Sequence, residues 1–248
     1  MGTAGLSAET RPAFYALAPG GWRDYVTLLH PPYTLWHLSY VAIGAALAPH
    51  LEVGRLLVAL AAFLLAVGIG AHALDELNGR PLRTQISTRA LIGLAGVSIG
   101  GAVAIGVYGS LAYTGWLAPL VVVGGFIVCA YNLELFGGLF HGDTWFALAW
   151  GSFPLLAAYL AVAERMTVEA LLAAVFAALL SVAQRRLSTQ VRTVRRRVAS
   201  VSGTVVLSDG SREPVTARTL TEAPEAALRA LTLAVIALAA SLLVLRLS

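Results

Sequence analysis

The sequence contains no lysine, a single cysteine and few charged residues of either sign. Charged residues make up 12% of the 248 positions and hydrophobic residues 58%, whereas typical soluble domains carry about 25% charged residues. The lone Cys129 lies in an apolar run, so no intrachain disulfide is possible. A soluble core cannot bury this much apolar surface but a lipid bilayer can, and the composition therefore predicts a membrane protein.

The N-terminal stretch also lacks an apolar segment followed by a small-residue cleavage site. No secretory signal peptide is expected there, and the first membrane helix should stay in the mature protein. All 17 basic residues are arginine and most fall in a few loops. In a membrane protein such a distribution reports topology, so we expect no nucleic-acid partner.

Apolar runs predict an all-α, polytopic transmembrane helical bundle of about seven spans. The expected helices cover about 34–49, 55–74, 90–112, 116–131, 144–162, 168–183 and 226–245. The domains predicted from them are an N-terminal lead over 1–33, a membrane domain over 34–183, an Arg-rich segment over 184–225 and a last membrane helix over 226–248.

The arginines indicate an orientation. With the N-terminus inside, the lead holds two arginines, the 75–89 loop three and the 184–229 segment nine, which leaves only Arg55, Arg165 and Arg246 outside. Since cytoplasmic loops are enriched in arginine, we expect an integral plasma (inner) membrane protein with a cytoplasmic N-terminus.

A small β-hairpin is predicted within the Arg-rich segment. The turn Ser208-Asp209-Gly210-Ser211 separates polar-apolar runs over 198–207 and 212–220, and Asp-Gly between such runs is a hairpin signal. A lone hairpin is marginal in water, so this one is expected to rest on the helix ends or on a protein partner. The alternative is that the segment is only a surface loop.

Polar residues at the end of the second predicted helix are the first candidate site. His72, Asp75 and Glu76 have the spacing to face one cavity, and the two carboxylates could hold Mg²⁺. Alternatively, Asp75 and Glu76 only solvate a helix end while Arg80 and Arg83 anchor it to lipid phosphate.

A second polar patch follows the fourth predicted helix and should lie on the same face. Its Glu134, His141 and Asp143 could bind metal or act as acid or base, or serve only for solvation. The aromatic residues Phe136, Phe140 and Trp145 suit an interfacial loop. His37, inside the first helix, is expected to be packed and hydrogen-bonded.

The chain resembles the UbiA superfamily of intramembrane prenyltransferases from about Leu28 to Ala183. His30-Pro31-Pro32 is similar to the start of that family's first span. The family's first Asp-rich motif would place Ala71 and His72 at its Asn-Asp positions, Asp75 at the next Asp and Gly79 at the Gly. Gly151, Pro154 and Tyr159 are similar to the family's central Gly-x-x-Pro region.

The second Asp-rich motif of that family has no counterpart here, because the segment 184–197 contains no acidic residue. Arginines bind phosphate oxygens bidentately, so Arg185, Arg186, Arg192 and Arg195 would form the diphosphate clamp of a variant enzyme. The chain also has about seven spans where the family commonly has nine.

The resemblance implies transfer of an isoprenoid from its diphosphate to an aromatic or lipid acceptor, with Mg²⁺ on Asp75 and Glu76. The residues expected to act in catalysis are Asp75, Glu76 and His72, and those expected to bind substrate are Asn78, Arg80, Arg83, Tyr131, Asn132, Arg185, Arg186 and Arg192.

Other readings of the sequence stay open. One is a catalytically degenerate relative that binds an isoprenoid lipid, or a protein partner through 184–225. Another is a lipid head-group enzyme, although the Asp-Gly-x-x-Ala-Arg signature is absent from the membrane helices. Transport is weakly supported, since no charged residue lies at mid-depth of a span.

Overall fold

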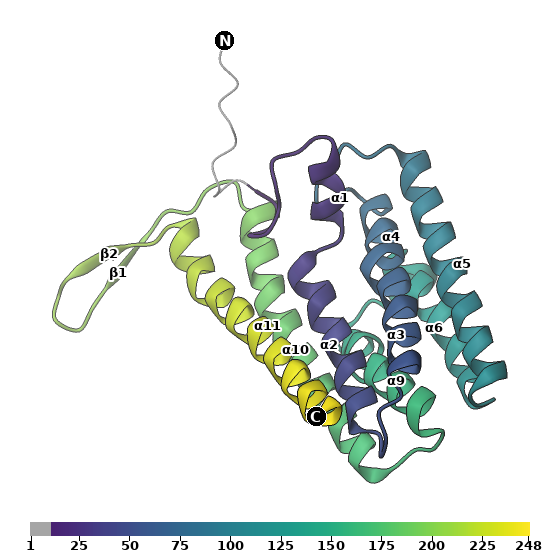
Figure 1. Cartoon of the computed structure of the whole chain (residues 1–248). Helices are drawn as coiled ribbons and strands as arrows, with labels where there is room; N and C mark the ends of the chain where they lie inside the picture. The colour runs from purple at the N-terminus through teal and green to yellow at the C-terminus, as the bar shows by residue number, and fades with distance from the viewer. Residues whose placement is uncertain (1–10) are drawn as a thin grey trace.

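A bundle of long helices forms the body of the protein (Figure 1). The computed structural model describes residues 11–248. The helices of the first half are α1 (Trp22–Leu28), α2 (Pro31–Leu47), α3 (Val53–Phe63), η2 (Leu64–Ala71), α4 (His72–Leu77), α5 (Thr88–Ala112) and α6 (Leu117–Asn132). Those of the second half are α7 (Leu135–Gly138), α8 (Asp143–Phe146), η3 (Ala147–Ser152), α9 (Phe153–Ala163), α10 (Val168–Arg197) and α11 (Ala217–Leu247).

Five helices of the described chain are long and apolar enough to cross a membrane: Val53–Leu77, Thr88–Ala112, Asp143–Ala163, Val168–Arg197 and Ala217–Leu247. The apolar α6 is shorter. Large apolar side chains such as Val97, Leu111 and Val122 are exposed on the outside of the bundle. An apolar exterior on helices of this length is that of an integral membrane protein.

Two of the long helices contain a π-helical stretch. Val53–Leu77 passes through η2 just before His72, and Asp143–Ala163 passes through η3, which carries Trp150. The extra residue in a π-helical turn rotates the side chains that follow it. Such turns are frequent at functional sites. Both π-helical stretches lead into the polar pocket described below.

Close helix contact in the bundle depends on glycine. A Cβ at Gly44 of α2 would lie 2.1 Å from the carbonyl oxygen of Leu155 in α9, and one at Gly151 would lie 2.7 Å from the carbonyl oxygen of Ala177 in α10. Trp36 and Tyr40 of α2 fill the adjoining core and are fully buried. Small residues at such crossings let helices pack backbone to backbone.

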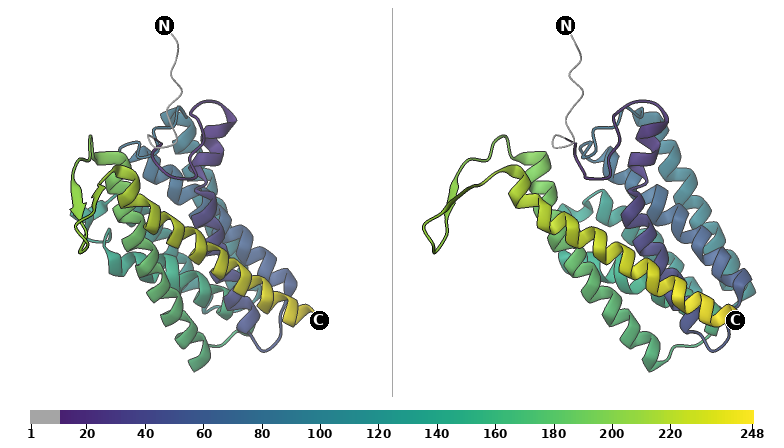
Figure 2. Two further views of the ribbon diagram at one scale, coloured as in Figure 1. Left: turned by 90° about the vertical axis from the view of Figure 1, so that its left-hand side faces the viewer. Right: turned by 60° about the vertical axis from the view of Figure 1, so that its left-hand side comes forward.

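The predicted hairpin is present but shorter than expected. β1 (Thr204–Val206) pairs antiparallel with β2 (Arg212–Pro214), with Thr204 opposite Pro214. Gly210 takes a φ of 84° at the turn, and the Asp209 carboxylate accepts a hydrogen bond from the Ser211 N–H at 2.8 Å. All residues of both strands are exposed, and the hairpin extends away from the bundle (Figures 1 and 2). The expectation that it rests on helix ends is wrong.

The Arg-rich segment over 184–225 is partly helical, because both helices that flank the hairpin are longer than predicted. Helix α10 continues through it to Arg197, and α11 begins at Ala217, so only residues 198–216 lie outside the helices. The segment 184–197 has no proline or glycine, arginine is a good helix former, and Gln184, Ser188 and Val191 bury one face of the extension.

Replacing Gly44 by alanine is expected to lower the melting temperature of the detergent-solubilised protein. The added methyl group would meet the Leu155 backbone rather than a side chain that can turn aside, and such overpacking costs about 1–3 kcal/mol. Gly93→Ala is the control, because a Cβ there meets nothing within 4 Å and alanine favours the helix. Equal melting temperatures for the two variants would contradict the close contact of α2 with α9.

Candidate functional site

A polar pocket lies at the end of the bundle where α4 and α6 stop and α10 continues. The cavity has a volume of about 90 Å³. Its wall comes from the N-terminal lead, α2, α4, α6, the helix through η3, and α10. The polar side chains of its lining include Tyr15, His30, His72, Asp75, Tyr131, Gln184, Arg185, Arg192 and Arg196.

Three arginines of α10 line the polar pocket. Arg185, Arg192 and Arg196 are seven and four residues apart, which places them on one face of the helix. The Arg185 Nε donates to Asp143 at 2.5 Å, and its guanidinium also contacts the Tyr131 hydroxyl. The Arg196 Nε donates to the carbonyl oxygen of Pro12 at 3.2 Å. The predicted Arg185 and Arg192 therefore lie at the pocket.

The other two arginines of the predicted clamp do not line the polar pocket. Arg186 is exposed on another face of α10. Arg195 forms an ion pair with Glu225 of α11, with its Nε 2.5 Å from Oε1. Arg196, which the sequence prediction omitted, takes their place. One residue along a helix turns the side chain by about 100°, so the run Arg195-Arg196-Arg197 gave no signal that favoured the middle position.

Among residues 11–248, Asp75 is the only carboxylate that lines the polar pocket. Arg196 and Arg192 act on it electrostatically from α10. Its oxygens accept no hydrogen bond from any of residues 11–248. A partly exposed carboxylate between arginines can orient a ligand, a water or a metal ion that enters the pocket.

Glu76 does not share that pocket, so the expectation that both carboxylates face one cavity is wrong. Its side chain is fully buried and accepts hydrogen bonds from the Leu82 N–H at 2.9 Å and from the N–H and hydroxyl of Thr84 at 2.8 and 2.9 Å. Glu76 thus fixes the loop between α4 and α5, and its oxygens are occupied by the protein itself.

Asn78 and Arg80 also stabilise that loop. The Asn78 amide donates to the carbonyl oxygen of Asn132 at 3.2 Å, which joins the ends of α4 and α6. Arg80 donates to the carbonyl oxygen of Ile86 at 2.5 Å and to Thr88. Arg83 is exposed. Neither arginine lines the polar pocket, and of the four residues only Asn132 does.

The second predicted patch contributes one side chain to the lining. His141 stacks on Tyr131 with ring centroids 4.5 Å apart, and its Nδ1 lies 2.9 Å from the Tyr131 carbonyl oxygen. Glu134 is exposed, and Asp143 forms an ion pair with Arg185, which itself lines the pocket. His37 is buried with its Nδ1 2.8 Å from the Trp150 carbonyl oxygen, as expected.

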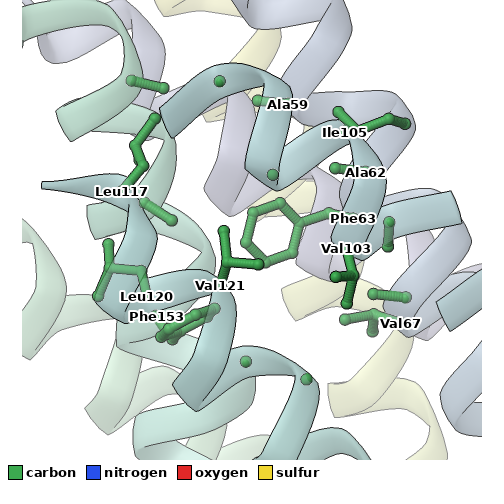
Figure 3. Close-up of a pocket in the computed structure, with 18 of the residues that line it drawn as sticks. Ala59, Ala62, Phe63, Val67, Val103, Ile105, Leu117, Leu120, Val121 and Phe153 are labelled. Carbon is green, nitrogen blue, oxygen red and sulfur yellow. The ribbon is translucent and has the colours of Figure 1, made fainter. Parts of the chain in front are cut away.

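An apolar cavity of about 140 Å³ adjoins the polar pocket. Phe63, Val121 and Phe153 face one another across it between α3, α6 and α9 (Figure 3). Trp150 lines both cavities, so the indole stands between the polar and the apolar space. At the far end Arg55 pairs with Glu164 at 2.6 Å. A cavity with a cationic wall thus lies beside a cavity with an apolar wall.

The donor set does not fit a Mg²⁺ ion held by the protein alone. No group of three His, Cys, Asp or Glu residues suitable for a metal occurs within residues 11–248, and Glu76 is occupied. Mg²⁺ is often held by one or two carboxylates together with substrate phosphates. Asp75 is the group that would meet a Mg²⁺ ion that enters with a diphosphate.

The chain matches no protein-family model, no curated protein and no solved structure. The two cavities and their linings are therefore the basis for the function of this protein that we propose.

Glu76→Ala is expected to lower the free energy of unfolding by about 3 kcal/mol, because it leaves the N–H groups of Leu82 and Thr84 buried without an acceptor. Limited digestion with trypsin should then cut faster after Arg83, which lies in the same loop and is followed by Thr84. Glu134→Ala removes an exposed carboxylate near the same end and should change neither property. A Glu76→Ala protein with unchanged stability that loses only a response to Mg²⁺ would mean that Glu76 is a metal ligand instead.

Proposed function

We propose that this chain is a UbiA-like membrane prenyltransferase, which binds an isoprenoid diphosphate in the two cavities and transfers the isoprenoid to an aromatic or lipid acceptor. The observation that carries the proposal is the set of Arg185, Arg192 and Arg196 around a polar pocket that shares Trp150 with a neighbouring apolar cavity. Guanidinium groups stay charged and bind phosphate oxygens in pairs, and the apolar cavity suits a prenyl chain.

The proposed orientation places the polar pocket at the cytoplasmic face of a prokaryotic inner membrane. Seven passes are counted when α2 and α6 are added to the five long helices. The N-terminal lead, the α4–α5 loop and the region from α10 to α11 then lie at one end, and they carry most of the arginines. This agrees with the enrichment of arginine in cytoplasmic loops.

The reaction breaks the bond between C1 of the isoprenoid and the ester oxygen of the first phosphate, and the electron pair remains on that oxygen. Arg192 and Arg196 stabilise the charge of the leaving diphosphate. A nucleophilic atom of the acceptor forms the new bond to C1 and loses its proton. The aromatic faces of Tyr131 and Trp150 line the pocket where positive charge develops on the prenyl carbon.

A second candidate is a non-catalytic protein that binds the same lipid. Within the described part of the chain a single carboxylate, that of Asp75, lines the pocket, whereas the family that the chain resembles uses two carboxylate clusters, and this difference favours the second candidate. Binding without turnover would identify this candidate. Docking of a protein partner through the exposed hairpin is compatible with either function.

The test is the melting temperature of the detergent-purified protein with geranylgeranyl diphosphate, with and without Mg²⁺. A ligand that binds only the folded state at 100 times its Kd stabilises by about 2.7 kcal/mol, so the melting temperature should rise. Arg192→Gln and Arg196→Gln should each weaken binding about tenfold. Arg186→Gln is the matched control, since Arg186 lies on the same helix but outside the pocket.

A rise that needs Mg²⁺, together with loss of turnover in Asp75→Ala, would support the metal-dependent enzyme. A rise without Mg²⁺ and no turnover would favour the second candidate. No rise under either condition, or equal weakening in all three arginine variants, would contradict binding in the polar pocket.

A further inference from the structure

One wall of the polar pocket is neither helix nor strand. Residues 11–19, the strap, are irregular, and Pro12, Ala13, Phe14 and Tyr15 of the strap line the pocket. The strap runs beside the end of α10 (Figure 1). A segment without a regular backbone hydrogen-bond ladder can leave its place more easily than a helix can.

Two arginines hold the strap through uncharged groups. The Arg196 Nε donates to the carbonyl oxygen of Pro12 at 3.2 Å. The guanidinium of Arg229 in α11 lies over the ring of Phe14, 5.1 Å from its centroid. A hydrogen bond from a guanidinium to an anionic oxygen is shorter and stronger than one to a neutral acceptor. An anion that enters the pocket therefore competes with Pro12 for Arg196, which lines the same pocket.

The other polar contacts of the strap are single hydrogen bonds. The Tyr15 hydroxyl lies 2.8 Å from Nδ1 of His30, and the Leu17 N–H donates to the Thr27 hydroxyl at 3.0 Å. Each of these bonds joins neutral groups, whose partners water can replace when the strap moves.

The strap also buries little apolar surface. Within residues 11–19 the buried side chains are those of Ala13 and Ala16, which pack with Leu82 of the α4–α5 loop. Alanine offers one methyl group, so this contact is small compared with the packing between the long helices. The strap is thus the most weakly packed wall of the polar pocket.

The chain is fixed again directly after the strap. Asp24 accepts from the N–H of Gly20 at 3.0 Å and from that of Gln85 at 2.9 Å. Ala18 and Pro19, just before this anchor, are exposed. A movement of the strap can therefore pivot at residues 18–19 and leave α1 in place.

We infer that the strap is a movable cover of the polar pocket. It lifts at residues 18–19 to admit an anionic ligand, and Arg196 exchanges the carbonyl oxygen of Pro12 for oxygens of that ligand. The inference rests on the proposed function for the nature of the ligand, whereas the movement itself does not depend on transfer. A closed cover slows both entry and exit of the ligand, whereas a direct contact with the ligand mainly slows its exit.

The first experiment locks the strap. Ala13→Cys with Leu82→Cys, in a Cys129→Ala background, offers a disulfide across their buried contact. Association of geranylgeranyl diphosphate with the detergent-purified full chain is followed by stopped-flow tryptophan fluorescence, since Trp150 lines the pocket. Oxidation should slow association at least about tenfold, and a reductant should restore it. Ala13→Cys alone in the same background should not respond to the oxidant.

The second experiment loosens the strap from outside the pocket. Arg229 contacts Phe14 but does not line the pocket. Arg229→Gln should make association and dissociation both about threefold faster, which is the effect of one exposed cation–π contact. Arg218→Gln is the matched control, because each variant removes an ion pair with a glutamate one turn away on α11. Arg192→Gln, which removes a proposed ligand contact, should instead raise mainly the dissociation rate.

Equal association rates for the oxidised and reduced forms of the double-cysteine variant would overturn the inference, as would equal rates for Arg229→Gln and Arg218→Gln. If the two introduced thiols do not oxidise, the comparison of Arg229→Gln with Arg218→Gln decides alone.

Failure of the proposed function gives a different result, namely no binding of geranylgeranyl diphosphate to any variant. The movement is then measured without a ligand, by the reaction of Ser188→Cys in the Cys129→Ala background with a methanethiosulfonate that carries a sulfonate group. Ser188 is buried and lines the polar pocket. The thiol should react about threefold faster with Arg229→Gln than with Arg218→Gln. Equal reaction rates would overturn the inference here too.

Discussion

The outer surface of this bundle is apolar, so its polar side chains have to find partners inside the bundle or at its ends. Helix α10 meets this constraint by ending in arginines that pair with groups from four other parts of the chain. Arg185 contacts Asp143 and Tyr131, Arg195 pairs with Glu225, and Arg196 donates to Pro12. These contacts bring the N-terminal lead, α6, α8 and α11 around one end of α10, and the first three of these line the polar pocket together with α10.

Two buried carboxylates hold the segments that surround that pocket. Asp24 accepts from the N–H of Gly20 at 3.0 Å and of Gln85 at 2.9 Å, which ties the N-terminal lead to the α4–α5 loop. Glu76 holds the same loop from the side of α4. With both acids engaged in backbone contacts, Asp75 is left as the carboxylate that can meet a ligand. Asp75 and Glu76, although adjacent in the sequence, therefore have two unrelated roles.

The proposed chemistry differs from that of a site built on two carboxylate clusters. Here the diphosphate would be held mainly by fixed guanidinium groups, whose charge does not depend on a bound metal. Trp150, between the polar and the apolar cavity, would then lie beside the reacting end of the prenyl chain.

The sequence by itself determined the membrane helices, the Asp-Gly turn of the hairpin and the gathering of polar residues after α4 and α6. These features depend on local composition and spacing, which can be read along the chain. It also indicated Asp75, His72, Tyr131, Arg185 and Arg192 as residues near one site, and all five line the polar pocket.

Only the tertiary structure decided which neighbours along the chain share that pocket. Asp75 and Glu76, or Arg195 and Arg196, differ by one position and point about 100° apart, so the packing of other segments selects between them. His30, Tyr15 and Gln184 come from three distant parts of the chain, and only the folded protein brings them to the lining of one pocket. The lining of a pocket is a property of the whole fold, and the sequence does not specify those surroundings residue by residue.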